Sequence, residues 1–74
     1  MSTSGINLQR LGLNIRRWRH GRRLTQAALA AQVGCGAGTI SAIERGRRDV
    51  SVEMLFALCC ALGCPIKELL LGVE

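Results

Sequence analysis

The apolar residues of this chain recur at helical spacing in short segments, and glycines or capping residues separate these segments. One such stripe consists of Leu55, Leu58, Cys59 and Leu62, at positions i, i+3, i+4 and i+7, and Gly63 follows it. No segment shows the alternation with a period of two that a half-buried strand requires. The pattern therefore supports only one fold class, an all-α bundle of short helices.

Boundary signals divide the chain into five predicted helices. Asn7, Thr25 and Ser51 carry the side chains that are preferred at helix N-caps. Glycine follows or ends four of the helices because it adopts the left-handed conformation that stops a helix, and Pro65 opens the fifth because proline is tolerated in a first turn. The predicted helices span residues 8–21, 26–33, 37–45, 52–62 and 65–71.

The length of the chain limits it to one domain. Seventy-four residues, of which 49% are hydrophobic, can build one small core and no second one. We expect a flexible N-terminal tail over residues 1–6 and a single domain over residues 7–74. The N-terminus lacks the basic and apolar regions of a secretory signal, and no apolar run is long enough to cross a membrane. These features predict a cytoplasmic protein with no membrane partner.

Charge is distributed unevenly along the chain. Residues 1–48 contain nine of the ten cations, all of them arginines, and one acid, whereas residues 49–74 have a net charge of −3. Arginine-rich surfaces suit phosphate because the guanidinium group bonds it bidentately. The aromatic fraction of 3% leaves little for stacking single-stranded bases. An anionic partner is therefore expected, while a solvated basic surface without a partner is the alternative.

Residues 26–45 have the anatomy of a DNA-binding helix-turn-helix. Ala30 is small where two helices would cross, and Gly34 occupies the turn position that requires a positive φ. Apolar side chains cover the inner faces of both helices, namely Leu29, Val33, Ile40 and Ile43. The outer face of the second helix stays free to enter a major groove about 12 Å wide.

These motifs, together with several others, make the sequence similar to the lambda-repressor-like, Cro-type regulators, also called the xenobiotic-response-element family. The resemblance covers roughly residues 8–72 and rests on Leu11 to Arg19, Leu24 to Gln26, Leu29-Ala30, Thr39 to Arg47, Ser51, and Ala61 to Gly63. It implies a compact five-helix domain that regulates transcription by binding double-stranded DNA. It also implies association with the nucleoid and no cofactor.

The resemblance assigns structural and phosphate-binding roles to specific side chains. Arg19 and Glu44 match the partly buried salt bridge of the family, which explains the lone acid of the basic half. Gln26, at the first position of its helix, matches the residue that grips a phosphate at a helix N-terminus. The remaining predicted phosphate contacts are arginines, namely Arg22, Arg23, Arg45, Arg47 and Arg48.

The base-facing positions depart from the family pattern. Where relatives carry long polar side chains, this chain has Ala37, Gly38 and Ala42, none of which can form a bidentate hydrogen bond with a base. Thr39 and Ser41 add only short hydroxyl groups. Direct readout of base sequence is therefore expected to be sparse. Because glycine is a poor helix former, we also expect the start of this helix to fray in the free protein.

The four cysteines and the titratable residues do not predict a metal site or an enzyme. Cys59 and Cys60 are adjacent on a helix and point about 100° apart, so they cannot both bind one tetrahedral ion. Packing of Cys35, Cys59 and Cys64 as small apolar residues is favoured over a thiol sensor or a zinc site. No nucleophile, base and orienting group can be assembled around His20, the only histidine.

A second apolar stripe predicts an interface. Val52, Phe56 and Cys60 follow one another at i, i+4 and i+8, opposite the core stripe of their helix, and Leu71 and Val73 add apolar groups near the C-terminus. Apolar residues gathered on one side indicate a contact surface. We expect a homodimer through the last two helices. The alternative is a protein-interaction module, antitoxin-like or scaffold, that binds a second protein there and contacts DNA only secondarily.

Overall fold

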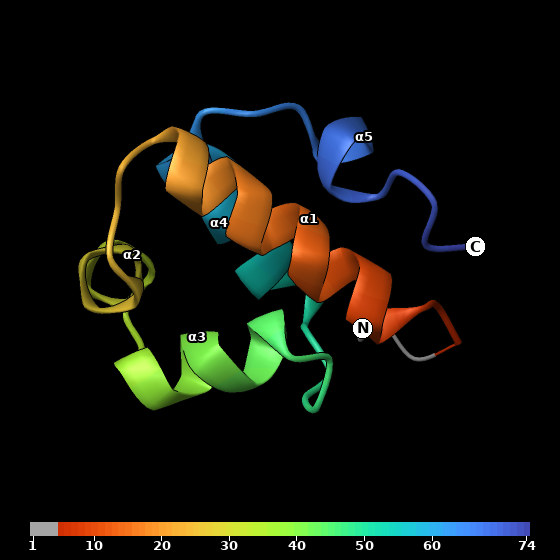
Figure 1. The fold of residues 1–74 in the computed structure, drawn as a ribbon, viewed down its shortest axis with the longest axis horizontal. Helices are drawn as coiled ribbons and strands as arrows, with labels where there is room; N and C mark the ends of the chain where they lie inside the picture. Colours follow the sequence, from red (N-terminus) through yellow and green to blue (C-terminus); the bar gives the residue numbers. More distant parts are fainter. Residues whose placement is uncertain (1–4) are drawn as a thin grey trace.

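The structure is a computed structural model that describes residues 5–74 (Figure 1). Its five helices are α1 (Leu8–Gly21), α2 (Gln26–Val33), α3 (Ala37–Glu44), α4 (Val52–Leu62) and α5 (Ile66–Leu69), and the described residues contain no β-sheet. The predicted all-α class is confirmed. Figure 1 shows α1 crossing in front of α4, with α3 below them and α5 beside the C-terminus.

The last helix is shorter than predicted. It spans four residues instead of the seven expected, and Pro65 is its N-cap, with ψ 146°. The chain leaves the helix at Leu70 and turns through Gly72, whose φ is +75°. This turn brings Val73 into the core, where it is 3% exposed. The prediction that Val73 belongs to an exposed apolar surface is therefore wrong.

Local hydrogen bonds explain where the helices begin and end. The side chains of Asn7, Thr25 and Ser51 each accept a hydrogen bond from a backbone N–H three residues ahead, at 3.0 Å. Gly34 and Gly63 take the left-handed conformation after α2 and α4. After α1, however, the left-handed residue is Arg23, with φ +58°, and not Gly21.

One apolar cluster joins all five helices. Its fully buried side chains come from every element and from the loop before α4, and they are Leu11, Ile15, Leu29, Ile40, Val50, Leu58, Leu62 and Leu69. Burying a side chain of this size stabilises a fold by about 1.5–3 kcal/mol. The core thereby fixes α3 against α1 and α2 and leaves one side of α3 uncovered.

The two ends of the described chain are held together. The N–H of Asn7 donates to the carbonyl of Val73 at 2.6 Å. The buried Asn14 side chain donates from Nδ2 to the carbonyls of Leu69 and Leu71, each at 2.8 Å. Of the tail predicted over residues 1–6, residues 1–4 lie outside the described part, and Ile6 packs against the core.

A glycine in the middle of α1 allows α1 and α3 to approach closely. A Cβ atom added at Gly12 would lie 2.4 Å from the carbonyl oxygen of Ile43 and 2.5 Å from that of Glu44. Both are backbone atoms at the C-terminal end of α3. Glycine inside a helix lowers stability relative to alanine by about 0.5–1 kcal/mol. The close contact with α3 explains why glycine nevertheless occupies position 12.

The cysteines divide into buried and exposed thiols. Cys59 and Cys64 are each 8% exposed and pack in the core, Cys35 is half-buried at its edge, and Cys60 is exposed. Burial raises the pKa of the Cys59 thiol. Burial, and then the neighbouring Cys59, raise the pKa of Cys64 to about 11. The predicted packing role of Cys35, Cys59 and Cys64 agrees with this placement.

These pKa shifts predict a sharp order of thiol reactivity. At pH 8 a disulfide reagent should modify Cys60 quickly, whereas Cys59 and Cys64 react only after unfolding, because only a thiolate attacks. The raised pKa values mean that the folded state holds these thiols protonated. Their contribution to stability is therefore fully present below about pH 9 and is lost as the pH rises toward 11. Rapid labelling of Cys64 in the folded Cys60→Ser variant would contradict this.

Candidate nucleic-acid interface

The α2–α3 unit is a tight helix-turn-helix. After α2, Gly34 adopts φ +79°, and the N–H of Cys35 donates back to the carbonyl of Ala30 at 3.0 Å. Gly36 then becomes the N-cap of α3 without any side-chain hydrogen bond. Ala30 is buried where the two helices cross. The turn therefore fixes the angle at which α3 leaves α2.

The outer face of α3 is uncovered and carries small side chains. Ile40 and Ile43 are buried on the opposite side, while Ala37 and Gly38 are exposed. Ser41 and Ala42 are half-buried beside them and share this face. The structure therefore brings four of the five predicted base-facing residues together, with only one hydroxyl among them.

Thr39 is the exception. It lies on the flank of α3 and lines a cavity with Ile43 and Met54, between α3 and α4. This position differs from the predicted place on the base-facing surface. The physical reason is that Thr39 precedes Ile43 by one helical turn, so the two side chains share a face that turns toward α4.

The predicted partners Arg19 and Glu44 form a buried ion pair. The guanidinium Nε lies 2.6 Å from Oε2 of Glu44, and Nη2 donates to Oε1 at 3.1 Å. The side chains are only 9% and 3% exposed. Arg19 also donates from Nη1 to the carbonyl of Leu24 at 2.8 Å. One side chain thus joins α1, the loop before α2, and the end of α3.

Gln26 completes this network in a way that the sequence did not indicate. Its Nε2 donates to Oε1 of Glu44 at 3.1 Å, so the carboxylate holds both the first residue of α2 and Arg19. This contact positions Gln26 at the N-terminus of α2, close to the end of α3. In the sequence, only the polar side chain at position 26 indicated a hydrogen bond. The sequence does not identify a partner that lies eighteen residues away.

The predicted phosphate-binding arginines fall into two groups. Arg45, Arg47 and Arg48 are exposed directly after α3, where a turn through Gly46, with φ +71°, carries the chain away. Arg23 is exposed in the loop between α1 and α2. These four guanidinium groups have no hydrogen bond or ion pair within residues 5–74.

Arg22 has a different role from the predicted one. Its Nε donates to the carbonyl of Leu62 at 2.7 Å, its Nη2 donates to that of Gly63 at 3.0 Å, and its guanidinium lies over the Trp18 ring. These carbonyls end α4, where a cation is favoured by the helix dipole. In this structure the Arg22 guanidinium therefore caps α4, which holds it at the end of that helix.

The apolar stripe on α4 is only partly exposed. Phe56 is 54% exposed and Leu71 is 56% exposed, and Cys60 is exposed as well. Val52 is half-buried. The predicted interface residues therefore do not form one fully open stripe, although two of them are large apolar side chains in contact with water.

Metal sites and membrane-spanning helices were also considered for residues 5–74. No three of their histidine, cysteine and acidic side chains lie close enough to hold a metal ion. None of their helices has the length and hydropathy that crossing a bilayer requires.

The start of α3 gives a prediction about stability. Gly38 lies in the first turn, its φ is not positive, and nothing lies within 4 Å of a Cβ added there. Gly38→Ala should therefore stabilise the free protein by about 1 kcal/mol and raise the melting temperature by about 4–8 °C. Amide exchange over residues 37–40 should slow in particular.

Gly21→Ala is the matched control for this substitution. Gly21 ends α1 and also has nothing within 4 Å of an added Cβ. The Gly21→Ala substitution should raise the melting temperature without selectively slowing amide exchange in α3. Exchange at residues 37–40 of the unaltered chain that is already as slow as in α4 would show that the start of α3 does not fray.

Comparisons with known proteins agree with this geometry. The sequence pattern of the helix-turn-helix family matches residues 15–69. The transcriptional regulator ClgR of Mycobacterium tuberculosis is 40% identical over 55 residues, which cover 74% of this chain and 47% of ClgR. The chain thus spans about half the length of that relative.

Two solved structures share the fold at higher coverage. The restriction-modification controller protein C.AhdI from Aeromonas hydrophila is 32% identical, with a TM-score of 0.81 over 84% of this chain and 94% of that one. The P22 c2 repressor, solved in complex with a synthetic operator, is 39% identical, with a TM-score of 0.78 and the same coverage of both chains. The match spans the α2–α3 unit and most of the core, so this chain belongs to the lambda-repressor-like helix-turn-helix family of DNA-binding transcriptional regulators.

Proposed function

We propose that this protein is a sequence-selective regulator of transcription that places α3 in the major groove of double-stranded DNA. The observation that carries this proposal is the uncovered outer face of α3, which ends at three exposed arginines, Arg45, Arg47 and Arg48. A helix in the groove with cations at its end is the docking geometry of helix-turn-helix proteins. The P22 c2 repressor, which shares the fold, was solved on a synthetic operator. A cytoplasmic, nucleoid-associated location fits this role.

Phosphate contacts are assigned to the groups that surround α3. Arg45, Arg47 and Arg48 lie at its C-terminal end, and Arg23 lies in the loop before α2. Gln26 stands at the N-terminus of α2, where backbone N–H groups and the helix dipole attract an anion. Its hydrogen bond to Glu44 orients the side chain and leaves the backbone N–H groups available.

Direct base readout supplies only a small part of the specificity. Ala37, Gly38 and Ala42 offer no hydrogen-bonding side chain, and Ser41 offers one hydroxyl. Ala42 has the size to contact a thymine methyl group. DNA shape, bridging water molecules and the spacing of two half-sites provide the rest.

A salt titration combined with site selection tests this function. Binding to a selected duplex should weaken with a slope in log affinity against log salt of about −0.9 for each phosphate contact. Arg47→Gln should reduce the slope by about one contact for all sequences, whereas Lys67→Gln, in the acidic half, should leave it unchanged. Selection from random duplexes that yields no common motif would refute sequence selectivity.

Dimerisation through α4 and the C-terminal segment is part of the proposal. Phe56 and Leu71 are each more than half exposed, and a two-fold dimer would bury them. Light scattering at tens of micromolar should give twice the monomer mass, and Phe56→Glu should restore the monomer.

A protein-interaction module that uses the same surface is the second candidate. Its support is the same exposure of Phe56 and Leu71. Binding of a protein partner through apolar side chains should be almost insensitive to salt, unlike DNA binding. A salt-insensitive complex together with a flat DNA titration would favour this candidate.

A further inference from the structure

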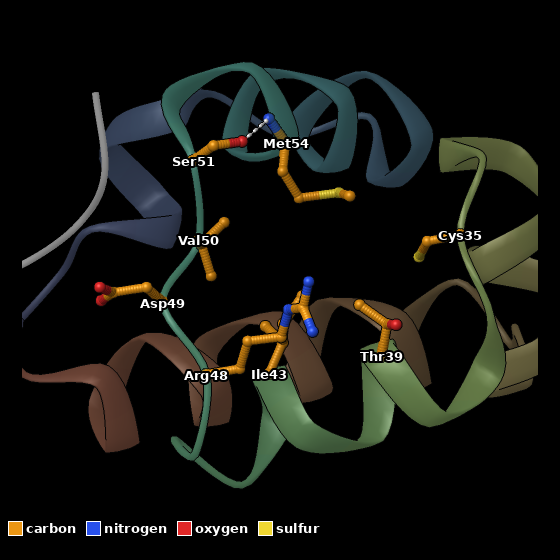
Figure 2. A pocket seen from close by; sticks show the side chains of 8 residues that line it. All are labelled: Cys35, Thr39, Ile43, Arg48, Asp49, Val50, Ser51 and Met54. Carbon is orange, nitrogen blue, oxygen red and sulfur yellow. Dashed lines mark hydrogen bonds between the residues drawn. The ribbon is translucent and has the colours of Figure 1, made fainter.

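A cavity lies between the DNA-facing helix and α4 (Figure 2). Its volume is about 340 Å³, which is within the range of about 300–1,000 Å³ that small-molecule sites occupy. It opens beside α3, and the loop between α3 and α4 forms one wall.

The walls of the cavity come from separate elements and combine apolar side chains with the polar Thr39, Arg48, Asp49 and Ser51. Ile43 contributes from α3, Val50 from the loop, Met54 from α4, and Cys35 from the turn after α2. Met54 and Cys35 are half-buried, so part of their surface faces the cavity. Thioether and thiol groups are polarisable and adapt to apolar ligands of different shapes.

One cation, Arg48, is directed into this cavity. Figure 2 shows the Arg48 side chain reaching over Ile43 toward the middle of the cavity, while the Asp49 carboxylate points away from it. Arg48 has no hydrogen bond or ion pair within residues 5–74. A guanidinium group beside apolar walls selects a ligand that carries a carboxylate, which it binds bidentately.

We propose that this cavity binds a small carboxylic acid with a short apolar body. The carboxylate pairs with Arg48, and the hydrocarbon part contacts Met54 and Cys35, above the buried Ile43 and Val50. Because Arg48 is also assigned to a DNA phosphate, the bound acid removes one phosphate contact and weakens DNA binding. This regulatory consequence rests on the proposed function, but binding of the acid does not.

The binding step is tested on the 74-residue chain without DNA. Butanoate, hexanoate, octanoate and 3-phenylpropanoate are titrated while the methyl resonances of Ile43 and Met54 are followed. At least one acid should shift both methyl groups saturably, with a dissociation constant on the order of millimolar, as the size of these molecules allows. The neutral amide of the same acid should bind at least about tenfold more weakly, because it lacks the charge-assisted bond.

Three variants connect the signal to the cavity. Arg48→Gln should abolish the preference for acid over amide, and Cys35→Leu should block the cavity and remove binding while leaving Arg48 in place. Arg16→Gln, an exposed arginine on α1, should behave like the unaltered chain. Equal binding of acid and amide, shifts unaffected by both cavity variants, or no saturable shift with any of the four acids would overturn the proposal.

The regulatory step is tested separately with the selected duplex. A saturating acid should weaken DNA binding by about tenfold, the equivalent of one charge-assisted contact, and should have no effect on Arg48→Gln. If the acid binds the free protein but DNA affinity is unchanged, the link to regulation is refuted while the site stands. If the duplex does not bind at all, the proposed function fails and the methyl titration still decides the site.

Discussion

Glu44→Ala is expected to destabilise the domain by about 3–5 kcal/mol, because it leaves the Arg19 guanidinium buried without its counter-charge. Both side chains are less than one-tenth exposed, and the pair is joined at 2.6 Å and 3.1 Å. The substitution also removes the acceptor of Gln26. The free energy of unfolding for a domain of this size is about 5–10 kcal/mol, so thermal denaturation should show a drop of more than about 12 °C.

A double substitution separates the ion pair from the packing. Arg19→Met with Glu44→Leu replaces two charges by apolar groups of similar volume, which is often neutral or stabilising in other buried pairs. This variant should be more stable than Glu44→Ala alone. An unchanged melting temperature in Glu44→Ala would show that the pair contributes nothing to stability.

Gly12→Ala is expected to cost about 3 kcal/mol or more, since overpacking at a fixed contact forces backbone shifts. The added methyl group would lie 2.4 Å from one carbonyl oxygen of α3 and 2.5 Å from the next. These atoms cannot rotate away as a side chain would, so α1 and α3 must separate, which also strains the Arg19–Glu44 pair. Chemical denaturation should show a lower midpoint and a partly lost cooperative transition.

Gly21→Ala again provides the matched control for this effect. It makes the same chemical change in the same helix but at a position with open space around it, so it should stabilise the protein by up to about 1 kcal/mol. Opposite signs for the two alanine substitutions would establish that close contact, and not helix propensity, decides the effect at Gly12. A stabilising effect of Gly12→Ala would disprove the close approach of the two helices.

The helices were predictable from the sequence because their signals are local. Asn7, Thr25 and Ser51 cap their helices with their own side chains, and Gly34 and Gly63 end α2 and α4. Such contacts span three or four residues and do not depend on the rest of the fold. The boundaries of α2 and α4 agree with the prediction to the residue.

The misplaced residues depend on contacts between distant segments. Arg22 was assigned to phosphate because it is basic, but its partners lie forty and forty-one residues away, at the end of α4. Val73 was predicted to be exposed because it lies after the last helix, where no helical repeat indicates which residues are buried. The turn through Gly72, which directs Val73 into the core, depends on the tertiary fold. The role of Gly12 had one signal, a glycine inside a helical pattern, which suggests close packing but does not identify the partner.

Hydrogen bonds join the residues near the start of the described chain to those near its end, and they bear on how short a fragment can still fold on its own. The family match begins at residue 15 and stops at residue 69, but Asn7 and Asn14 lie before it, and Leu71 and Val73 lie after it. Asn14 anchors the carbonyls of Leu69 and Leu71, and Val73 receives the N–H of Asn7. A fragment trimmed to residues 15–69 would lose these hydrogen bonds, so we expect the shortest stable version of this domain to extend beyond the matched residues at both ends.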